Sequence, residues 1–195
     1  MKKKVIILFL LGVLGAFGQE EQIILELQRF TELKAFDGIS IDLVKSNENK
    51  AVITGANTQK VAIVNKNGKL KIRMNIDKIF SGYRTFVTLY FTEELKVIDV
   101  NEDARISSKE VFVQDVLELK AQEGGELVLN CQTEQLLVKA VTGGKVTTTG
   151  FTDNQDIIIN TGGAYSGSKF KSKFTTVSVN AGGIAAYYAT IYEID

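Results

Sequence analysis

The stretch IIINTGGAYSG, residues 157–167, decides the fold because close copies of it recur along the second half of the chain. The copies include LVKAVTGGKVT, residues 137–147, and VSVNAGGIAAY, residues 177–187. The paired glycines of the repeat stand at nearly constant spacing, at Gly124-Gly125, Gly143-Gly144, Gly162-Gly163 and Gly182-Gly183. A degenerate copy, Asp103-Ala104, precedes the first pair by a similar interval. A fixed period of about 20 residues is typical of a β-solenoid, in which each repeat forms one coil.

Side chains at fixed distances from the pair keep one character in every copy. The position five residues upstream of the first glycine, or of Asp103, is apolar in every copy: Ile98, Leu119, Val138, Ile157 and Val177. Three residues before and three after it, the side chains are again apolar apart from Tyr165, whereas four before it they are mostly polar. Eight residues after it the pattern loosens. Stacked coils lie about 4.8 Å apart, so equivalent side chains form columns that must keep one character.

These columns predict an all-β protein whose second half is a right-handed parallel β-helix with about 20 residues per coil. We expect the glycine pair at a sharp corner that needs positive φ, which residues with side chains adopt at a cost. A sandwich or barrel with coincidental glycines is the alternative, but strands of such folds usually recur every ~8–12 residues.

The chain before residue 95 predicts β-hairpins packed on this helix. In VAIVNKNGKLKIRM, residues 61–74, the dipeptide Asn67-Gly68 fits a two-residue turn because both positions tolerate positive φ. Apolar runs on either side of SNENK, residues 46–50, read as a further pair of strands. We therefore divide the chain into a leader at 1–18, an N-terminal β segment at 19–94 and the β-helix repeats at 95–195, with 30–195 forming one continuous domain.

The chain begins with MKKKVIILFLLGVLGAFGQ, which has the layout of a secretory signal peptide. Three lysines precede an apolar run at 5–17, and Ala16 and Gly18 occupy the small-residue positions of a cleavage site before Gln19. A spanning helix needs about 20 apolar residues, more than this run provides. We expect a mature chain without a transmembrane segment, exported to the periplasm, the outer surface or the medium.

The composition of the chain limits which partners it can bind and which catalytic or metal-binding groups it can supply. Removing 1–18 takes away three lysines and no acids, so 20 basic residues face 23 acidic ones and the net charge is −3. A weak negative charge argues against nucleic acid as a partner. The chain has no histidine, which removes the commonest general base and metal ligand. Cys131 is the only cysteine, so no intrachain disulfide forms, and we expect it in the core.

The order of these motifs resembles a known family. FDGISIDLV at 36–44 is followed by ITGAN at 53–57, by NGKLKI at 67–72, and then by repeats of the form INTGG and VNAGG. This combination is similar to the putative auto-transporter adhesin head domain, the GIN-domain family, over about residues 30–195. The resemblance implies an exported β-helix with an adhesive role, and it carries no catalytic residues. Two departures from the family are expected. Residues 192–195 stop part-way round a coil, which reads either as a truncated copy or as an open last coil, whose unpaired strand edge would invite association. No membrane barrel is expected after the repeats.

The segment KFKSKF, residues 169–174, offers candidate binding residues. Lys169, Lys171 and Lys173 alternate with other side chains, so a strand would show a basic stripe suited to an acidic glycan. The alternative is a solvated outer face whose charges discourage edge pairing. Tyr188 is expected to point outward and to suit a sugar or a protein partner, whereas Tyr165 and Tyr187 are expected in the core.

Several carboxylates are candidates for catalytic or metal-binding groups. Glycoside hydrolysis uses two carboxyl groups about 5–10 Å apart, but Asp153, Asp156, Glu123 and Glu126 are expected in different columns with no repeated acidic column. The repeat also lacks the GGxGxD spacing of calcium-binding rolls. A single calcium site on Asp153, Asn154 and Asp156 is the remaining alternative for a metal. We therefore assign no catalytic residue, metal or cofactor.

The sequence favours an exported, non-enzymatic, adhesin-like protein that binds glycan or protein through a face of its β-helix. One alternative is an envelope protein that assembles with copies of itself through an open coil end. The other is an enzyme acting on polysaccharide.

Overall fold

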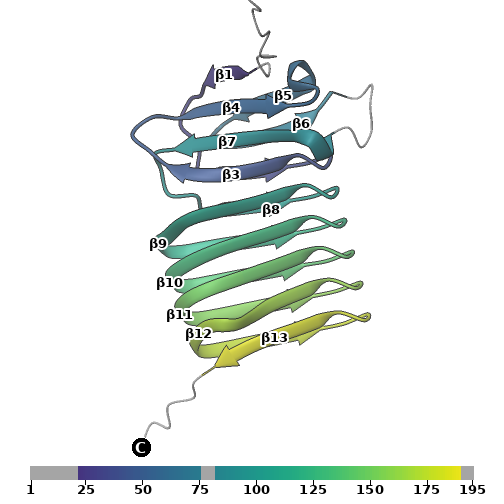
Figure 1. Ribbon diagram of the computed structural model, residues 1–195. Coiled ribbons are helices and arrows are strands. Elements are labelled where there is room, and N and C mark those ends of the chain that lie inside the picture. The colour runs from purple at the N-terminus through teal and green to yellow at the C-terminus, as the bar shows by residue number, and fades with distance from the viewer. Residues whose placement is uncertain (1–21, 76–81, 190–195) are drawn as a thin grey trace, which may run out of the picture.

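The computed structural model describes residues 22–75 and 82–189, whose strands wind into a parallel β-solenoid capped by further strands (Figure 1). The leader predicted at 1–18 and the chain end at 190–195 lie outside the described residues. The strands are β1 Ile23–Glu26, β2 Glu32–Ala35, β3 Ser40–Lys45, β4 Lys50–Gly55, β5 Val61–Lys66, β6 Lys69–Met74, β7 Thr85–Phe91, β8 Val97–Val100, β9 Arg105–Ala121, β10 Glu126–Ala140, β11 Lys145–Ile159, β12 Ala164–Val179 and β13 Ile184–Ala189. Two short 3₁₀ turns, η1 Thr58–Lys60 and η2 Gly82–Arg84, complete the elements.

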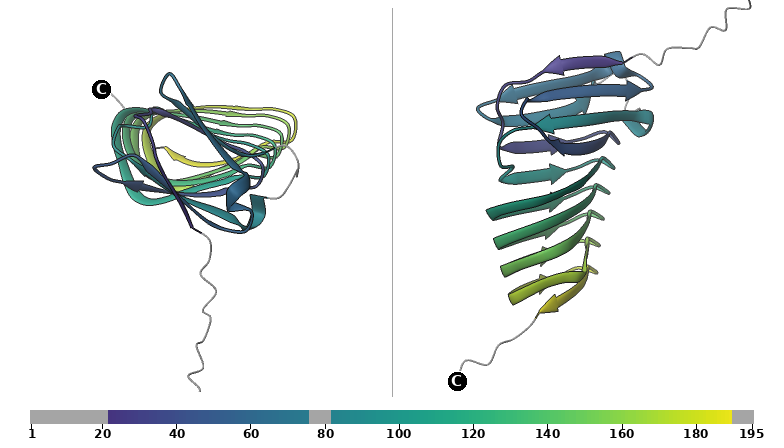
Figure 2. Two further views of the ribbon diagram at one scale, coloured as in Figure 1. Left: turned by 90° about the horizontal axis from the view of Figure 1, so that it is seen from above. Right: turned by 60° about the vertical axis from the view of Figure 1, so that its left-hand side comes forward.

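The predicted β-helix is confirmed by strands that pair in parallel, one coil apart. Val138 on β10 pairs with Leu119 on β9 and with Ile157 on β11, and β12 and β13 continue the stack. Figure 2 shows these coils from above as nested loops. The side chains of the three residues are buried, so this column forms part of the core.

The corner of each coil is a tight turn with two successive residues at positive φ. Thr161 has φ 48 and Gly162 φ 72, and the Gly163 N–H donates to the Asn160 carbonyl at 3.0 Å. This is the two-residue turn in which both central positions need the left-handed region. The same pair of positive φ values recurs at Asp37-Gly38, Glu102-Asp103, Glu123-Gly124, Thr142-Gly143 and Ala181-Gly182.

The second glycine of each pair is needed for close packing between coils, and not for the positive φ that the sequence predicts. A Cβ placed on Gly163 would lie 2.2 Å from the Ala140 carbonyl oxygen of the neighbouring coil, whereas one on Gly162 would meet nothing within 4 Å. The first glycine therefore serves the backbone conformation, and the second lets adjacent coils approach. The narrow corners line up along one edge of the molecule (Figure 1).

Each coil presents two faces joined by a wide bend. The front face is the outward side of the continuous path β1-β4-β7-β3-β9-β10-β11-β12-β13, which uses the first part of each long strand. The back face is formed by β5, β6, β2 and β8 together with the last part of the long strands. Near the end of the bend, Asp153 and Asn154 both point outward between the buried Thr152 and Gln155, which marks a second corner.

The N-terminal segment contains the predicted hairpin but not the second one. β5 and β6 pair antiparallel across Asn67-Gly68, whose φ values are 54 and 77. The strands around residues 46–50, β3 and β4, do not pair with each other, because β7 lies between them, parallel to β3 and antiparallel to β4. The reason is that β2 and β3 flank a corner at Asp37-Gly38 and stack on β8 and β9, as one more coil.

The core is apolar near the N-terminal end and more polar toward the other end. Cys131 is fully buried, as expected of a core residue, and burial raises the pKa of its thiol to about 12. Tyr165 is buried as predicted, and its hydroxyl lies 2.6 Å from Thr148 Oγ1 and accepts a bond from Gln155 Nε2 at 2.5 Å. Burial raises the pKa of Tyr165 to about 12.

Candidate functional site

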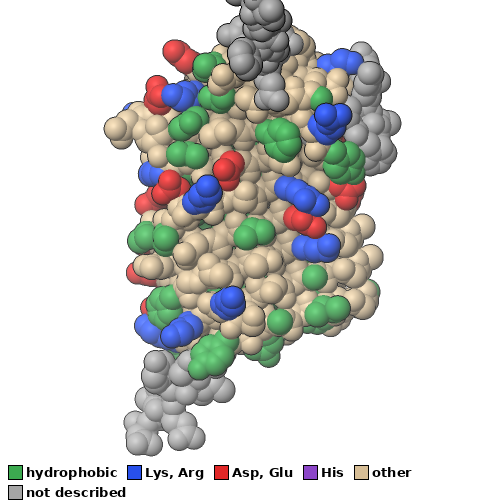
Figure 3. Space-filling model, viewed as in Figure 1, with side chains coloured by type: hydrophobic (Ala, Val, Ile, Leu, Met, Phe, Trp, Pro, Cys, Tyr) green, Lys and Arg blue, Asp and Glu red, His purple; other side chains and the backbone are tan. Residues whose placement is uncertain are grey.

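The front face carries a column of alternating charges. Its members, one per strand from β7 to β13, are Phe86, Ser40, Arg105, Glu126, Lys145, Ala164 and Ile184. In Figure 3, which views this face, basic and acidic side chains can be followed one below another. Glu126 lies between its neighbours, 3.4 Å from Arg105 Nε and 3.3 Å from Lys145 Nζ. Exposed ion pairs are worth only about 0–1 kcal/mol, so this ladder orders the side chains more than it stabilises the fold.

A groove runs along β3 within the front face. Two outward side chains of β3, Ser40 and Asp42, are short. Ser40 lies between Phe86 of β7 and Arg105 of β9, and Asp42 lies between Thr88 and Ser107 of the same two strands. The groove is lined by Ser40, Ile41, Asp42, Phe86, Val87, Thr88, Arg105, Ser107, Ser108 and Lys109. Phe86 is 51% exposed, and Ser107 Oγ donates to Asp42 Oδ1 at 3.1 Å. Because the lining stands on paired strands, its geometry is fixed before any ligand arrives.

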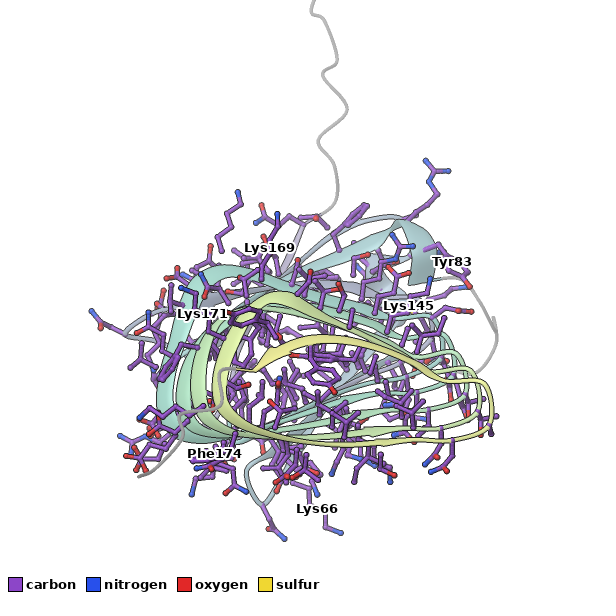
Figure 4. All side chains as sticks on the ribbon, turned by 90° about the horizontal axis from the view of Figure 1, so that it is seen from below. Lys66, Tyr83, Lys145, Lys169, Lys171 and Phe174 are labelled. Atoms are coloured by element: carbon purple, nitrogen blue, oxygen red, sulfur yellow. The ribbon has the colours of Figure 1, made fainter. Side chains whose placement is uncertain are left out.

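The predicted basic stripe wraps the bend instead of lying along a flat strand. Figure 4 shows Lys169 on the side of the front face, Lys171 at the bend and Phe174 on the opposite side. Lys169 and Lys171 are exposed, but Lys173 is half-buried, with Nζ 2.7 Å from Asp153 and over the ring of Phe151. The expected alternation also fails at Phe174, which is 53% exposed because the second corner turns two consecutive residues outward.

Two of the predicted tyrosines lie near the last described strand. Tyr188 is exposed and pairs in register with Lys171, so the structure brings these two candidates together. Tyr187 was expected in the core and is 49% exposed. The reason is that β13 has a strand on only one side among residues 22–75 and 82–189, so this last coil is covered from one direction.

A repeated acidic column exists, contrary to the expectation from sequence. Strand register places Glu134 between Asp115 and Asp153 on successive coils, all at the second corner. These side chains line a shallow groove together with Glu94, Val113, Gln114, Gln132, Thr133 and Phe151. The sequence does contain a signal for this column. Each acid, Glu94 included, stands nine residues before the first residue of the next corner pair, and Lys173 takes this position in the last copy.

The carboxylates considered for catalysis do not form a pair. Asp153 is bound by Lys173, Asp156 accepts a long 3.5 Å bond from Gln135, and Glu126 lies between two cations. Among residues 22–75 and 82–189, no three acidic or cysteine side chains come together in a way that could hold a metal ion.

A close acidic pair lies at the narrow corner. Hydrogen bonding to Asp37, together with burial and repulsion from Asp37 and Glu123, raises the pKa of Glu102 to about 7. Asp37 also accepts a bond from the Met74 N–H at 2.9 Å, which ties the corner to β6. The neighbouring Asp103 accepts a bond from the Tyr83 hydroxyl at 2.9 Å.

Comparison with known proteins identifies the family of the chain. A sequence model of the family described as "putative auto-transporter adhesin, head GIN domain" matches residues 29–192. The chain belongs to this family. A search of curated proteins finds no match for this GIN-domain protein.

Solved structures share the fold of the GIN-domain chain. A putative adhesin from Bacteroides fragilis has a TM-score of 0.77 and 13% identity, covering 86% of this chain and 78% of its own. A putative adhesin from Parabacteroides distasonis has a TM-score of 0.65 and 16% identity, covering 89% and 83%. A putative lipid binding protein from the same organism has a TM-score of 0.64 and 14% identity, covering 89% and 84%. At such identities the likeness shows the fold alone.

Membership of an adhesin family agrees with a surface protein of adhesin type. The described ranges, 22–75 and 82–189, hold no helix with the length and apolar character of a membrane span.

Proposed function

We propose that the protein is exported through its N-terminal signal and acts at the cell surface as a non-enzymatic binding protein that holds glycan or protein on its front face. The observation that carries the proposal is the front face itself, nine paired strands wide, with exposed apolar side chains and a charge ladder at fixed spacing. A rigid strand face loses little conformational entropy when it binds, which favours recognition. The family supports the adhesive role.

The carboxylates support binding without turnover. General acid catalysis needs a carboxyl group positioned at the scissile bond with a raised pKa. Glu102, whose pKa is raised, shares its hydrogen bond with Asp37 at the narrow corner, outside the groove of the front face.

A glycan array probed with the mature chain, residues 19–195, tests this function, with sugar release measured on the same glycans. We expect retention on a subset of glycans or on a surface protein, with no released sugar. Cleavage that survives purification would contradict the proposal, as would the absence of any retained ligand.

Export is tested separately by N-terminal sequencing of the protein from the native cell. We expect a chain that begins at Gln19, because the cleavage site follows Gly18. Full-length chain with Met1 in the membrane fraction would contradict export by cleavage.

Self-assembly is a second candidate function, favoured by the last described coil. Natural sheet edges are guarded by charges, yet residues 174–189 contain none. The outer edge of β13 pairs with no strand of the described ranges. Val179 is 42% and Tyr187 is 49% exposed, although the equivalent residues of the preceding coils are buried. A second copy would cover both features at once.

Sedimentation velocity over a range of concentrations tests this alternative. If copies associate through this end, the mature chain forms larger species as concentration rises, and Tyr187→Lys returns it to monomer. Gln132→Lys is the control, because it introduces lysine at an exposed position of the bend, away from β13. A monomer at all concentrations, or association that Tyr187→Lys leaves intact, would contradict assembly through β13.

A further inference from the structure

We infer that the groove along β3 binds an acidic saccharide, of the class that carries a carboxylate on a pyranose ring. The inference rests on the proposed binding function and adds the location and the chemical class of the ligand. It follows from the shape, the apolar platform and the charges of one set of side chains, Ser40, Asp42, Phe86, Thr88, Arg105, Ser107 and Lys109.

The shape of the groove comes from the short side chains of one strand between longer ones. Ser40 lies directly between Phe86 and Arg105 in strand register. One strand away on either side the backbone is about 4.8 Å distant, so the trough between the two long side chains is about as wide as a sugar ring. Strand pairing on both sides prevents β3 from moving to fill it.

Phe86 provides the apolar platform. Its side chain is half-exposed on a strand that is otherwise well packed. A Cβ on Gly55 would lie 3.0 Å from Phe86 Cδ2, so the ring rests against the glycine backbone of β4. An aromatic ring held in this way offers rigid contact area at low entropic cost, and the C–H face of a pyranose fits such a surface.

The polar lining favours an anion that also has hydroxyl groups. Arg105 is exposed and its Nε lies 3.4 Å from Glu126, a long contact that leaves the guanidinium able to make the bidentate contact that carboxylates accept. Lys109 is exposed and has no ion-pair partner in the described ranges. Asp42 is the one carboxylate of the lining and already accepts a bond from Ser107. Two cations therefore face one anion, while the hydroxyls of Ser40, Thr88 and Ser107 suit the hydroxyls of a sugar.

The test is a titration of the mature chain, residues 19–195, with oligogalacturonate of four units, followed by two-dimensional NMR and calorimetry. Cellotetraose serves as the neutral saccharide and tetraglutamate as the acidic peptide. We expect saturable binding of oligogalacturonate that is at least tenfold tighter than binding of either comparison ligand. Arg105→Gln and Phe86→Leu should each weaken binding at least fivefold.

Arg73→Gln is the matched control, because it makes the same substitution at an exposed arginine of β6, on the back face and outside the groove. We expect this variant to bind within twofold of the unsubstituted chain, and all variants to unfold in the same temperature range. Equal weakening by Arg73→Gln and Arg105→Gln would show general charge attraction and overturn the inference.

The remaining outcomes separate this inference from the proposed function. If tetraglutamate binds as tightly as oligogalacturonate, the saccharide class is wrong. If the chain binds another glycan or a protein on the array but ignores oligogalacturonate, the proposed function stands and the inference fails. If nothing binds in either experiment, both are wrong.

Discussion

At the scale of single residues, the two glycines of a corner should differ in how they tolerate a methyl group. Gly162→Ala adds a side chain at φ 72 with nothing within 4 Å, so we expect a loss of about 1–2 kcal/mol from left-handed strain. Gly163→Ala places its Cβ 2.2 Å from a backbone oxygen, so the coils must separate, and the loss should be about 3 kcal/mol or more. Urea unfolding of the two variants measures the difference. A larger loss for Gly162→Ala would contradict these roles of the two glycines.

A second residue-scale prediction concerns pH. The pKa of Glu102 in the fold, about 7, lies above its ordinary value of 4.5 because of Asp37. The folded state therefore holds this proton more tightly than the unfolded state, so the stabilisation is present below pH 4.5 and is lost as pH rises through 7. Glu102→Gln cannot ionise, and we expect a higher Tm than the unsubstituted chain at pH 8 with little difference at pH 5. An equal change in Tm at both pH values would contradict the assignment.

At the scale of elements, the second corner stacks like charges. Glu134 has an acid on the coil to each side, Asp115 and Asp153, at the spacing of about 4.8 Å between strands. Directly opposed like charges destabilise a sheet, so Glu134→Lys should raise the free energy of unfolding by about 0.5–1 kcal/mol at low salt. The gain should shrink in 1 M salt, where the Debye length is about 3 Å. Glu134→Gln separates loss of repulsion from gained attraction; no gain from either variant would show that solvent already screens the column.

The coils could be predicted from sequence because four successive corners carry a glycine pair at nearly constant spacing. Inward columns close to the corner, such as Val138 and Ile157, were predicted correctly. Columns at the wide bend were not predicted, since the register shifts between Thr147 and Gly150, on the way into the bend. Counting forward from one glycine pair loses the alignment there, and only counting backward from the next pair recovers it. The acidic column was missed for this reason.

The groove and the N-terminal topology had no local signal. β7 enters between β3 and β4 although β5 and β6 separate it from them along the chain, and nothing in the turn at residues 46–50 shows that a third strand separates its flanks. The groove needs Phe86, Ser40 and Arg105 side by side, and this neighbourhood exists only once the strand order is known. By contrast, the exposure of Lys169, Lys171 and Tyr188 agreed with their expected outward positions, while their role in binding stays a prediction.

At the scale of the whole molecule, we propose that one broad face of the solenoid binds and the other does not. Val128 and Ile158 offer a matched pair for this purpose, since both are exposed, β-branched and placed on neighbouring long strands, Val128 on the front face and Ile158 on the back. The most direct measurement is the affinity of the Val128→Glu and Ile158→Glu variants for the ligand that the unsubstituted chain retains on the array. We expect Val128→Glu to weaken binding at least tenfold and Ile158→Glu to stay within twofold. Equal losses, or a loss confined to Ile158→Glu, would contradict a binding role for the front face.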